Sequence, residues 1–186
     1  STRLEVNVKR NGSEYFLIFG PNGKLKKPME VIGKVPIRDT GTRIQFWPDK
    51  KFFDSNVFLE NDISTLLRAK AMLLPGVKFS LGIEKSGKFD NQTWYFPDGI
   101  KGYFNACVSQ ENQVTTSLFG ERFVMDKEGS DTYFSAGEGA MWALSWSYEG
   151  ENVTESYVNM IPTRLGGTHV AGLRDGIYTV LKKFIG

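Results

Sequence analysis

The sequence predicts an α+β fold, in which a small antiparallel β unit precedes a region where helices and strands intermix. Over the first fifty positions, short runs of alternating apolar and polar residues are separated by turn-forming residues, a pattern typical of β-hairpins. Later segments carry helical apolar spacing bounded by capping residues or proline. Because these helices and strands follow no strict βαβ period, the pattern favours the α+β class over a parallel α/β sheet.

The N-terminal region is expected to form four strands. Two alternating runs flank Asn11-Gly12, and this dipeptide favours a type I′ hairpin turn because both central residues need positive φ. Pro48 ends the pattern, which indicates one part over residues 1–49 and a second part over 50–186. The expected strands cover residues 4–8, 15–19, 29–35 and 42–47.

The second region is expected to contain three helices and five short strands. Asp62 or Ser64 caps the first helix, and Pro75-Gly76 ends it. Asp98 caps the second helix, and the polar residues over 109–116 indicate a loop. The expected helices cover residues 62–74, 99–108 and 170–184, and the expected strands cover 77–83, 93–96, 118–125, 140–148 and 154–161.

The composition indicates a soluble globular protein. Hydrophobic residues make up 40% of the 186 positions and charged residues 24%, which leaves apolar area for a core. The formal net charge is only +2, so contact with nucleic acid would need a local basic patch. Cys107 is the single cysteine, which excludes an internal disulfide and a multi-cysteine zinc site. No apolar run reaches the roughly 18 residues that cross a bilayer, and we expect a cytoplasmic protein.

The most distinctive segment, at residues 157–177, reads YVNMIPTRLGGTHVAGLRDGI. Its first residues alternate in polarity, so Val158, Met160 and Pro162 are expected on one face of an extended strand. Gly166-Gly167 allows an abrupt corner, because glycine adopts backbone dihedrals that other residues avoid. The segment therefore predicts a strand that turns sharply into the last helix.

Thr168 and His169 follow this corner. The threonine is the expected N-cap of the last helix. His169 is the only histidine, and a metal site would need further ligands that the neighbouring sequence does not supply. General acid–base chemistry has no carboxylate or serine at a supporting spacing. We therefore expect a structural role in the turn for Gly166, Gly167, Thr168 and His169.

Cys107 and the four tryptophans are expected in the core. The thiol ends an apolar helical stretch, so a buried, inert side chain is favoured over a nucleophile. The tryptophans alternate with aliphatic residues in expected strands. They are Trp47, Trp94, Trp142 and Trp146.

Several motifs resemble the B subunits of bacterial type IIA DNA topoisomerases. Residues 161–177, IPTRLGGTHVAGLRDGI, are similar to the GGTHxxGxR segment of that family, and residues 41–55, GTRIQFWPDKKFFDS, to its GTxxxFWP segment. LRAKAMLLPGVKF at 67–79 and WYFPDGIKGY at 94–103 continue the resemblance in the same order. It covers nearly the whole chain and is weakest over 108–135. The wording of FFDS, AKAMLLPGV and SYVNMIPT resembles the topoisomerase IV branch more than the gyrase branch.

The resemblance implies that residues 1–49 are closing strands of a GHKL-type ATPase domain. Residues 50–186 would be a transducer domain with a ribosomal protein S5 domain 2-like fold, without its C-terminal part. The chain would then be an internal fragment, with the family's catalytic glutamate, magnesium-binding asparagine and glycine-rich lid before Ser1, and its Gln-Thr-Lys loop after Gly186. We therefore expect no catalytic residue and no metal ligand in this chain, and neither tight nucleotide binding nor hydrolysis by the fragment alone.

The function that the resemblance implies is ATP-dependent DNA topoisomerase activity of the full-length parent. Binding and hydrolysis of ATP with Mg²⁺ would drive passage of one DNA duplex through another, which decatenates and relaxes DNA. The implied partners are the topoisomerase IV A subunit, double-stranded DNA, a second copy of the parent chain, and aminocoumarin-type inhibitors. Two alternatives stay open: a gyrase B subunit, which supercoils DNA, and a non-enzymatic S5-like module that binds nucleic acid.

Three residues match the family's nucleotide pocket. By residue type alone, Gly41-Thr42 is usually a turn and a strand start, and Arg10 beside a hairpin turn is usually a solvated charge. In the family, the threonine of GTxxxFWP reaches the adenine end of the pocket, partly through water, which suits a hydroxyl that both donates and accepts. The resemblance implies this role for Thr42, packing from the same strand face for Ile44, and stacking on a ligand at the pocket mouth for Arg10.

Three basic residues of the last helix are candidates for contact with DNA. Lysines and arginines on a helix surface usually serve only solvation. In the family, however, the arginine that ends GGTHxxGxR faces the cavity through which a DNA duplex passes, and a guanidinium there would contact phosphates without reading sequence. The resemblance implies this role for Arg174, and Lys182 and Lys183 are weaker additions.

Overall fold

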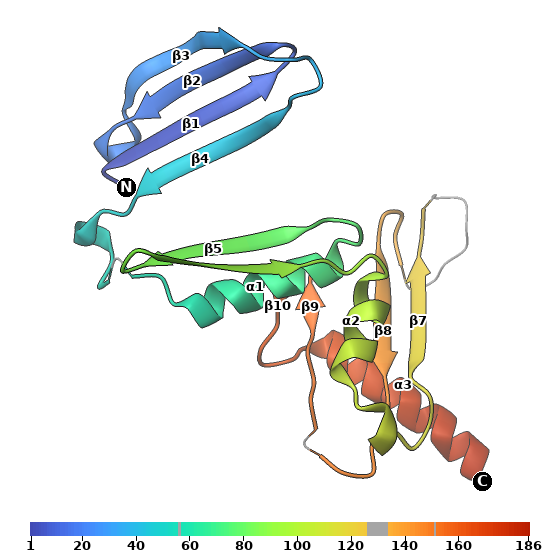
Figure 1. Ribbon diagram of the computed structural model, residues 1–186. Coiled ribbons are helices and arrows are strands. Elements are labelled where there is room, and N and C mark those ends of the chain that lie inside the picture. Colours follow the sequence, from blue (N-terminus) through green and yellow to red (C-terminus); the bar gives the residue numbers. More distant parts are fainter. Residues whose placement is uncertain (56, 126–133, 151) are drawn as a thin grey trace. The chain divides into compact units, whose positions relative to one another are not determined.

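The computed structural model describes residues 1–55, 57–125, 134–150 and 152–186. They form two compact units, Ser1–Leu59 and Glu60–Gly186 (Figure 1). The first unit is an antiparallel sheet and the second combines helices with short antiparallel pairs, which confirms the α+β class. Among the described helices, none combines the length and apolar character that a membrane crossing requires.

The first unit is a four-stranded antiparallel sheet with the order β3-β2-β1-β4. Its central hairpin turns at Asn11 and Gly12, which have φ values of 52° and 76°, as the Asn-Gly dipeptide predicts. Two single-turn 3-10 helices, Pro21–Gly23 and Lys50–Phe52, follow β2 and β4. The strands are β1 (Arg3–Arg10), β2 (Ser13–Phe19), β3 (Leu25–Lys34) and β4 (Gly41–Trp47).

The two faces of this sheet differ in polarity, because side chains alternate along each strand and paired residues share a face. On one face, Val6 lies between Leu17 and Ile44 in the strand register. On the other face, Asn7 lies between Phe16 and Arg43. The apolar face is open over much of its area, since the side chain of Ile44 is 61% exposed.

The second unit begins with α1 (Glu60–Leu73), which contacts the hairpin of β5 (Phe79–Lys85) and β6 (Lys88–Trp94). It also contacts α2 (Gly99–Cys107). Ala69, Ala71 and Met72 on α1 are the buried apolar residues of the described chain. The remaining elements are the 3-10 turn Gln110–Asn112, β7 (Leu118–Phe123) paired with β8 (Gly139–Leu144), β9 (Tyr157–Val158) paired with β10 (Ile161–Pro162), and α3 (Thr168–Ile185).

The expected continuous strand over 154–161 is wrong. The chain folds back within it, and Tyr157 pairs with Pro162 while Val158 pairs with Ile161. The two residues between them, Asn159 and Met160, have φ values of 47° and 65°. Left-handed backbone is tolerated by asparagine and is unusual for methionine, so the alternating pattern concealed a tight turn.

The structure corrects all three N-cap predictions. α1 begins at Glu60, so Asp62 and Ser64 lie inside the helix and neither caps it. Asp98 holds the N-cap position of α2, but its side chain makes no capping hydrogen bond. Thr168 is the first residue of α3, and Gly167 occupies the N-cap position in its place. Glycine is accepted at an N-cap, so the corner itself starts the helix without help from the threonine hydroxyl.

Burial was over-predicted for the cysteine and for two tryptophans. The Cys107 side chain is exposed at the end of α2. Trp47 and Trp146 are each 38% exposed, while Trp94 and Trp142 are half-buried. Each unit has only a small core, which cannot enclose every large aromatic side chain or the end of a short helix.

Candidate functional site

The strand register brings Thr42, Ile44 and Arg10 to one face of the first unit. Thr42 pairs with Val8 in β1, and Ile44 pairs with Val6. Arg10 follows Val8 by two residues and therefore projects from the same face. All three side chains are exposed, at the hairpin end of an otherwise apolar surface. The sheet thus gathers a hydroxyl, an aliphatic side chain and a guanidinium on one face. Thr42 and Ile44 follow Arg10 by 32 and 34 positions in the sequence.

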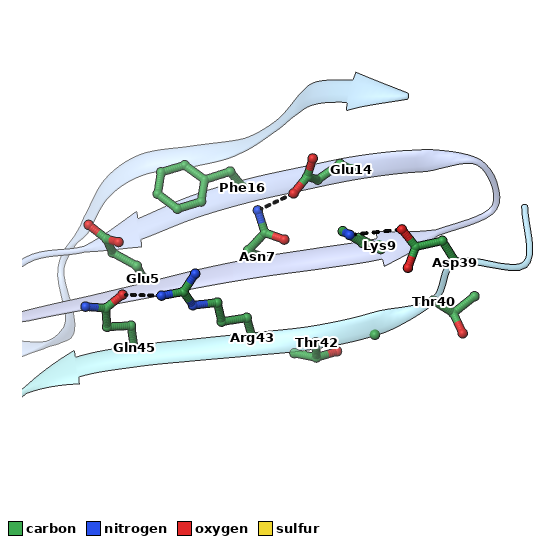
Figure 2. Close-up of a pocket in the computed structure, with 11 residues that line it drawn as sticks. Glu5, Asn7, Lys9, Glu14, Phe16, Asp39, Thr40, Thr42, Arg43 and Gln45 are labelled. Carbon is green, nitrogen blue, oxygen red and sulfur yellow. Dashed lines mark hydrogen bonds and ion pairs between the residues drawn. The ribbon is translucent and has the colours of Figure 1, made fainter. Parts of the chain in front are cut away.

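A pocket of about 530 Å³ lies on the first unit, mainly over its polar face (Figure 2). Lys9 Nζ donates to Asp39 Oδ2 at 2.9 Å, and Asn7 Nδ2 donates to Glu14 Oε1 at 2.9 Å. The hydrogen bond and charge of Asp39 raise the pKa of Lys9. The lining residues are Glu5, Asn7, Lys9, Glu14, Phe16, Asp39, Thr40, Gly41, Thr42, Arg43 and Gln45.

This pocket is not the site that the nucleotide residues outline. Thr42 on the edge strand β4 borders it, whereas Ile44 and Arg10 do not. Most of its charged and amide side chains pair with one another, and Arg43 also donates to Gln45 at 3.3 Å. An internally paired polar surface of this kind is typical of a solvated sheet face.

The Gly-Gly corner is held by backbone hydrogen bonds. Gly166 has a φ of 74°, and its N–H donates to the Thr163 carbonyl at 2.9 Å. The carbonyl of Gly167 accepts from the N–H groups of Val170 and Ala171, each at 3.1 Å. A Cβ on Gly167 would lie 2.9 Å from the His169 ring, closer than a side-chain carbon can approach, so glycine fits this position.

His169 lies against the same corner. Its Nε2 is 3.3 Å from Thr163 Oγ1, which in turn lies 2.6 Å from Ser156 Oγ. These contacts suit the structural role expected for the histidine, and that role remains a prediction. Among the described residues, no three histidine, cysteine or acidic side chains gather closely enough to hold a metal ion.

The three basic candidates of α3 do not lie on one side of the helix. At about 100° per residue, Lys182 is about 80° around the axis from Arg174, and Lys183 is on the opposite side. Arg174 donates from a guanidinium N–H to Thr154 Oγ1 at 3.5 Å, and all three side chains are exposed. Arg174 and Lys182 can therefore face one ligand together, whereas Lys183 faces away from Arg174.

A polar cluster around Glu155 was not predicted from the sequence. Its carboxylate accepts from the Tyr103 hydroxyl at 3.0 and 3.2 Å and from the Tyr157 hydroxyl at 2.9 Å. Arg68 on α1 pairs with it at 3.8 Å and stacks 5.6 Å from the centre of the Tyr103 ring. Tyr103 and Glu155 are 52 positions apart, so no local pattern announces the contact.

Burial and the neighbouring carboxylate keep both tyrosines protonated. Burial and a hydrogen bond to Glu155 raise the pKa of Tyr157 to about 12. The pKa of Tyr103 is also raised, first by burial, then by hydrogen bonding to Cys107 and by the charge of Glu155. Both hydroxyls therefore act as donors to the carboxylate at neutral pH.

Comparisons with known proteins identify the family. The family model of DNA gyrase B matches residues 99–186. The B subunit of DNA topoisomerase 4 from Pseudomonas aeruginosa is 42% identical over 99% of this chain, and that from Escherichia coli is 40% identical over 99%. The B subunit of DNA gyrase from Mycoplasmoides gallisepticum is 29% identical over 99%. The chain spans only 27% of the length of the first two relatives.

Solved structures agree with these relatives. The topoisomerase IV ATP-binding domain of Francisella tularensis, in complex with a small-molecule inhibitor, has a TM-score of 0.65 and 32% identity. The similarity extends over 100% of this chain and over 46% of the Francisella tularensis chain. The 43K ATPase domain of Thermus thermophilus gyrase B, in complex with an aminocoumarin, has a TM-score of 0.70 and 25% identity, with 92% of this chain covering 43% of it.

The class that this fold defines is therefore the one represented by the solved ATP-binding domain of topoisomerase IV and the ATPase domain of gyrase B. The chain belongs to the family that comprises the B subunits of DNA gyrase and of topoisomerase IV. Relatives at 37–42% identity over 99% of the chain are topoisomerase IV proteins.

Proposed function

We propose that this chain is part of a topoisomerase IV B subunit, which couples ATP binding and hydrolysis to DNA strand passage. One observation carries the proposal: identity of about 40% with topoisomerase IV relatives extends over 99% of the chain, across both units. Similarity of that extent is expected where both units serve one common activity. The whole protein would decatenate and relax DNA together with the topoisomerase IV A subunit.

The first unit would supply one wall of the nucleotide pocket. Thr42, Ile44 and Arg10 share an exposed face, and their chemistry fits a purine nucleotide. A hydroxyl exchanges hydrogen bonds with the adenine edge or a bridging water, an aliphatic chain packs on the ring, and a guanidinium stacks at the mouth. ATP bound there would supply the energy for strand passage, with Mg²⁺ as its companion ion in the whole protein. The same wall would take aminocoumarin-type inhibitors.

The second unit would be the transducer domain, with an S5 domain 2-like fold, and the first unit the end of the GHKL ATPase domain. Arg174 would contact DNA phosphates, with Lys182 beside it and Lys183 on the other side of α3. A second copy of the whole protein would complete the ATP-dependent gate, and the reaction would take place in the cytoplasm. Nucleotide would favour a closed arrangement of the two copies, which is a population shift between two states.

A gyrase B subunit is the second candidate, because the matching family model describes DNA gyrase B. Gyrase would introduce negative supercoils, whereas topoisomerase IV would decatenate linked circles. Both activities need ATP, so only the DNA product separates the two candidates.

A chimeric protein tests the proposal. In a topoisomerase IV B subunit, the matching segment is replaced by these 186 residues, and the protein is reconstituted with its A subunit. We expect ATP-dependent decatenation of linked DNA circles, and a loss of about tenfold or more in Thr42→Ala but not in Thr42→Ser, which keeps the hydroxyl. Decatenation that is absent, or indifferent to Thr42→Ala, would count against the assignment, and supercoiling of relaxed DNA with a gyrase A subunit would favour the alternative.

Calorimetry on the isolated chain tests how complete the pocket is. A non-hydrolysable ATP analogue is titrated with magnesium present. We expect no saturable binding, because one wall of a pocket leaves most of a nucleotide in water. Saturable binding that Thr42→Ala abolishes would show that the 186 residues hold a more complete nucleotide site than we propose.

A further inference from the structure

Residues 154–157 connect three helices of the second unit through consecutive side chains. Glu155 reaches Arg68 on α1 and Tyr103 on α2, at the distances given above. The residues on either side of it reach α3 and the corner that precedes α3. Thr154 Oγ1 accepts from Arg174, and Ser156 Oγ lies 2.6 Å from Thr163 Oγ1.

The corner end of this connection continues into the start of α3. The Ser156 carbonyl accepts from the Thr163 N–H at 2.8 Å, and Thr163 Oγ1 lies 3.3 Å from His169 Nε2. α3 packs loosely otherwise: Val170, Leu173 and Ile177 are half-buried, and no residue of the helix is fully buried. Its direction therefore depends strongly on contacts at its N-terminal half.

Glu155 is the member of this segment that hydrogen-bonds or forms an ion pair with α1 and α2. Its side chain is 35% exposed, and its carboxylate accepts hydrogen bonds from two tyrosine hydroxyls beside the Arg68 guanidinium. The hydroxyl–carboxylate distances are 2.9–3.2 Å, so the cluster acts through the number of its contacts rather than through one short, strong bond. Two partners on other helices, Arg68 and Tyr103, fix its position more firmly than one would, and Tyr157 adds a contact within the segment.

We propose that Glu155 is a positioning residue that fastens residues 154–157 to α1 and α2 and thereby sets the direction of the Arg174 guanidinium on α3. Loss of the carboxylate frees the segment, and Thr154 then no longer holds Arg174 in one orientation. The DNA role of Arg174 rests on the proposed function, whereas its orientation by Glu155 does not.

Hydrogen exchange and arginine NMR on the 186-residue chain test the positioning. In Glu155→Ala, we expect the amides of the first two turns of α3 to exchange at least about fivefold faster, because local opening there becomes easier. The Arg174 Nε–H signal should move toward the position of a freely rotating arginine. Glu149→Ala is the matched control, since Glu149 is exposed and has no hydrogen bond or ion pair in the described structure.

Milder variants keep the test decisive if Glu155→Ala does not fold. Tyr103→Phe and Tyr157→Phe each remove one donor to the carboxylate and retain the ring. Each should give a smaller change of the same sign in α3 exchange and in the Arg174 signal. Unchanged exchange and an unchanged Arg174 signal in the folded variants would overturn the proposal.

Binding of a short DNA duplex separates this proposal from the proposed function. At low salt, where phosphate contacts are strongest, Arg174→Ala and Glu155→Ala should both weaken binding about threefold or more, and Glu149→Ala should not. If the unmodified chain binds no DNA, the DNA role fails while the exchange data still decide the positioning. If Arg174→Ala weakens binding and Glu155→Ala does not, Glu155 does not position Arg174.

Discussion

The two units of the molecule differ in the contacts that stabilise each of them internally. In the first unit, β1, β2 and β3 pair in chain order, and β4 pairs with β1. Long runs of paired residues define this sheet. In the second unit, short pairs of strands and three helices are joined by a few side chains that are distant in sequence. The comparison teaches that a regular sheet tolerates single changes better than a unit whose elements depend on a small core and one polar cluster.

The largest expected effect is in the core of the second unit. Met72 on α1 is 3% exposed, whereas Met29 on β3 is 64% exposed. Met72→Ala should destabilise the second unit by about 2–5 kcal/mol because it leaves a cavity, and Met29→Ala should change the first unit by less than about 0.5 kcal/mol. Urea unfolding followed by NMR signals from each unit measures both. Equal effects of the two changes would remove the contrast between the units.

The hairpin turn of the first unit offers the next effect. Gly12 has a φ of 76°, where a residue with a Cβ is strained, so Gly12→Ala should cost about 1–2 kcal/mol. Gly41→Ala is the control, because a Cβ at Gly41 meets no atom within 4 Å and its φ is not in the left-handed region. The shift in the thermal midpoint of the first unit measures the cost. A midpoint that falls equally in both variants would show that the turn geometry is not what matters.

A smaller effect appears at high pH in the second unit. The pKa of Tyr157 is raised to about 12, so the folded state favours the protonated hydroxyl. This contribution is complete below the unfolded pKa of about 10 and is lost as pH rises toward 12. Because Tyr157 is partly exposed, we expect it to stay below about 1 kcal/mol.

Urea unfolding between about pH 8 and pH 11.5 checks the Tyr157 contribution. The unmodified chain should lose more stability over this range than Tyr157→Phe, since the variant has no hydroxyl to ionise at that position. Parallel stability curves for the two proteins would show that the hydroxyl does not contribute.

The smallest expected effect is at the surface pair of Lys9 and Asp39. Lys9 Nζ and Asp39 Oδ2 are 2.9 Å apart, with side chains that are 37% and 44% exposed. Water and salt screen such a pair, so Asp39→Asn should leave the thermal midpoint of the first unit within experimental error. A clear, salt-dependent drop would mean that the polar face contributes more to the sheet than its exposure indicates.

The sequence was most reliable where structure is set by near neighbours. The Asn11-Gly12 turn, the four strands of the first unit and the positions of all three helices followed from local patterns, with ends shifted by a few residues. The alternating run before the Gly-Gly corner misled, because Asn159 and Met160 adopt left-handed backbone that alternation does not reveal. The exposure of Cys107 was also missed, since burial depends on how many elements surround a helix rather than on the helix alone.

The residues of the candidate sites also divide into those that local motifs predicted and those that only distant contacts revealed. Motifs in the sequence singled out Thr42, Ile44 and Arg10, and the β1–β4 register then placed them on one face. Nothing local marked Glu155, because its partners Arg68 and Tyr103 come from helices far away in the chain.

By itself, the sequence determined the α+β class, the hairpin, the helices and the family, because these depend on residue type at fixed short spacings. Only the tertiary structure decided which residues meet: the shared face of Arg10 with Thr42 and Ile44, and the cluster around Glu155. The physical reason is that side-chain hydrogen bonds and burial are set by distances in space, which chain spacing does not fix.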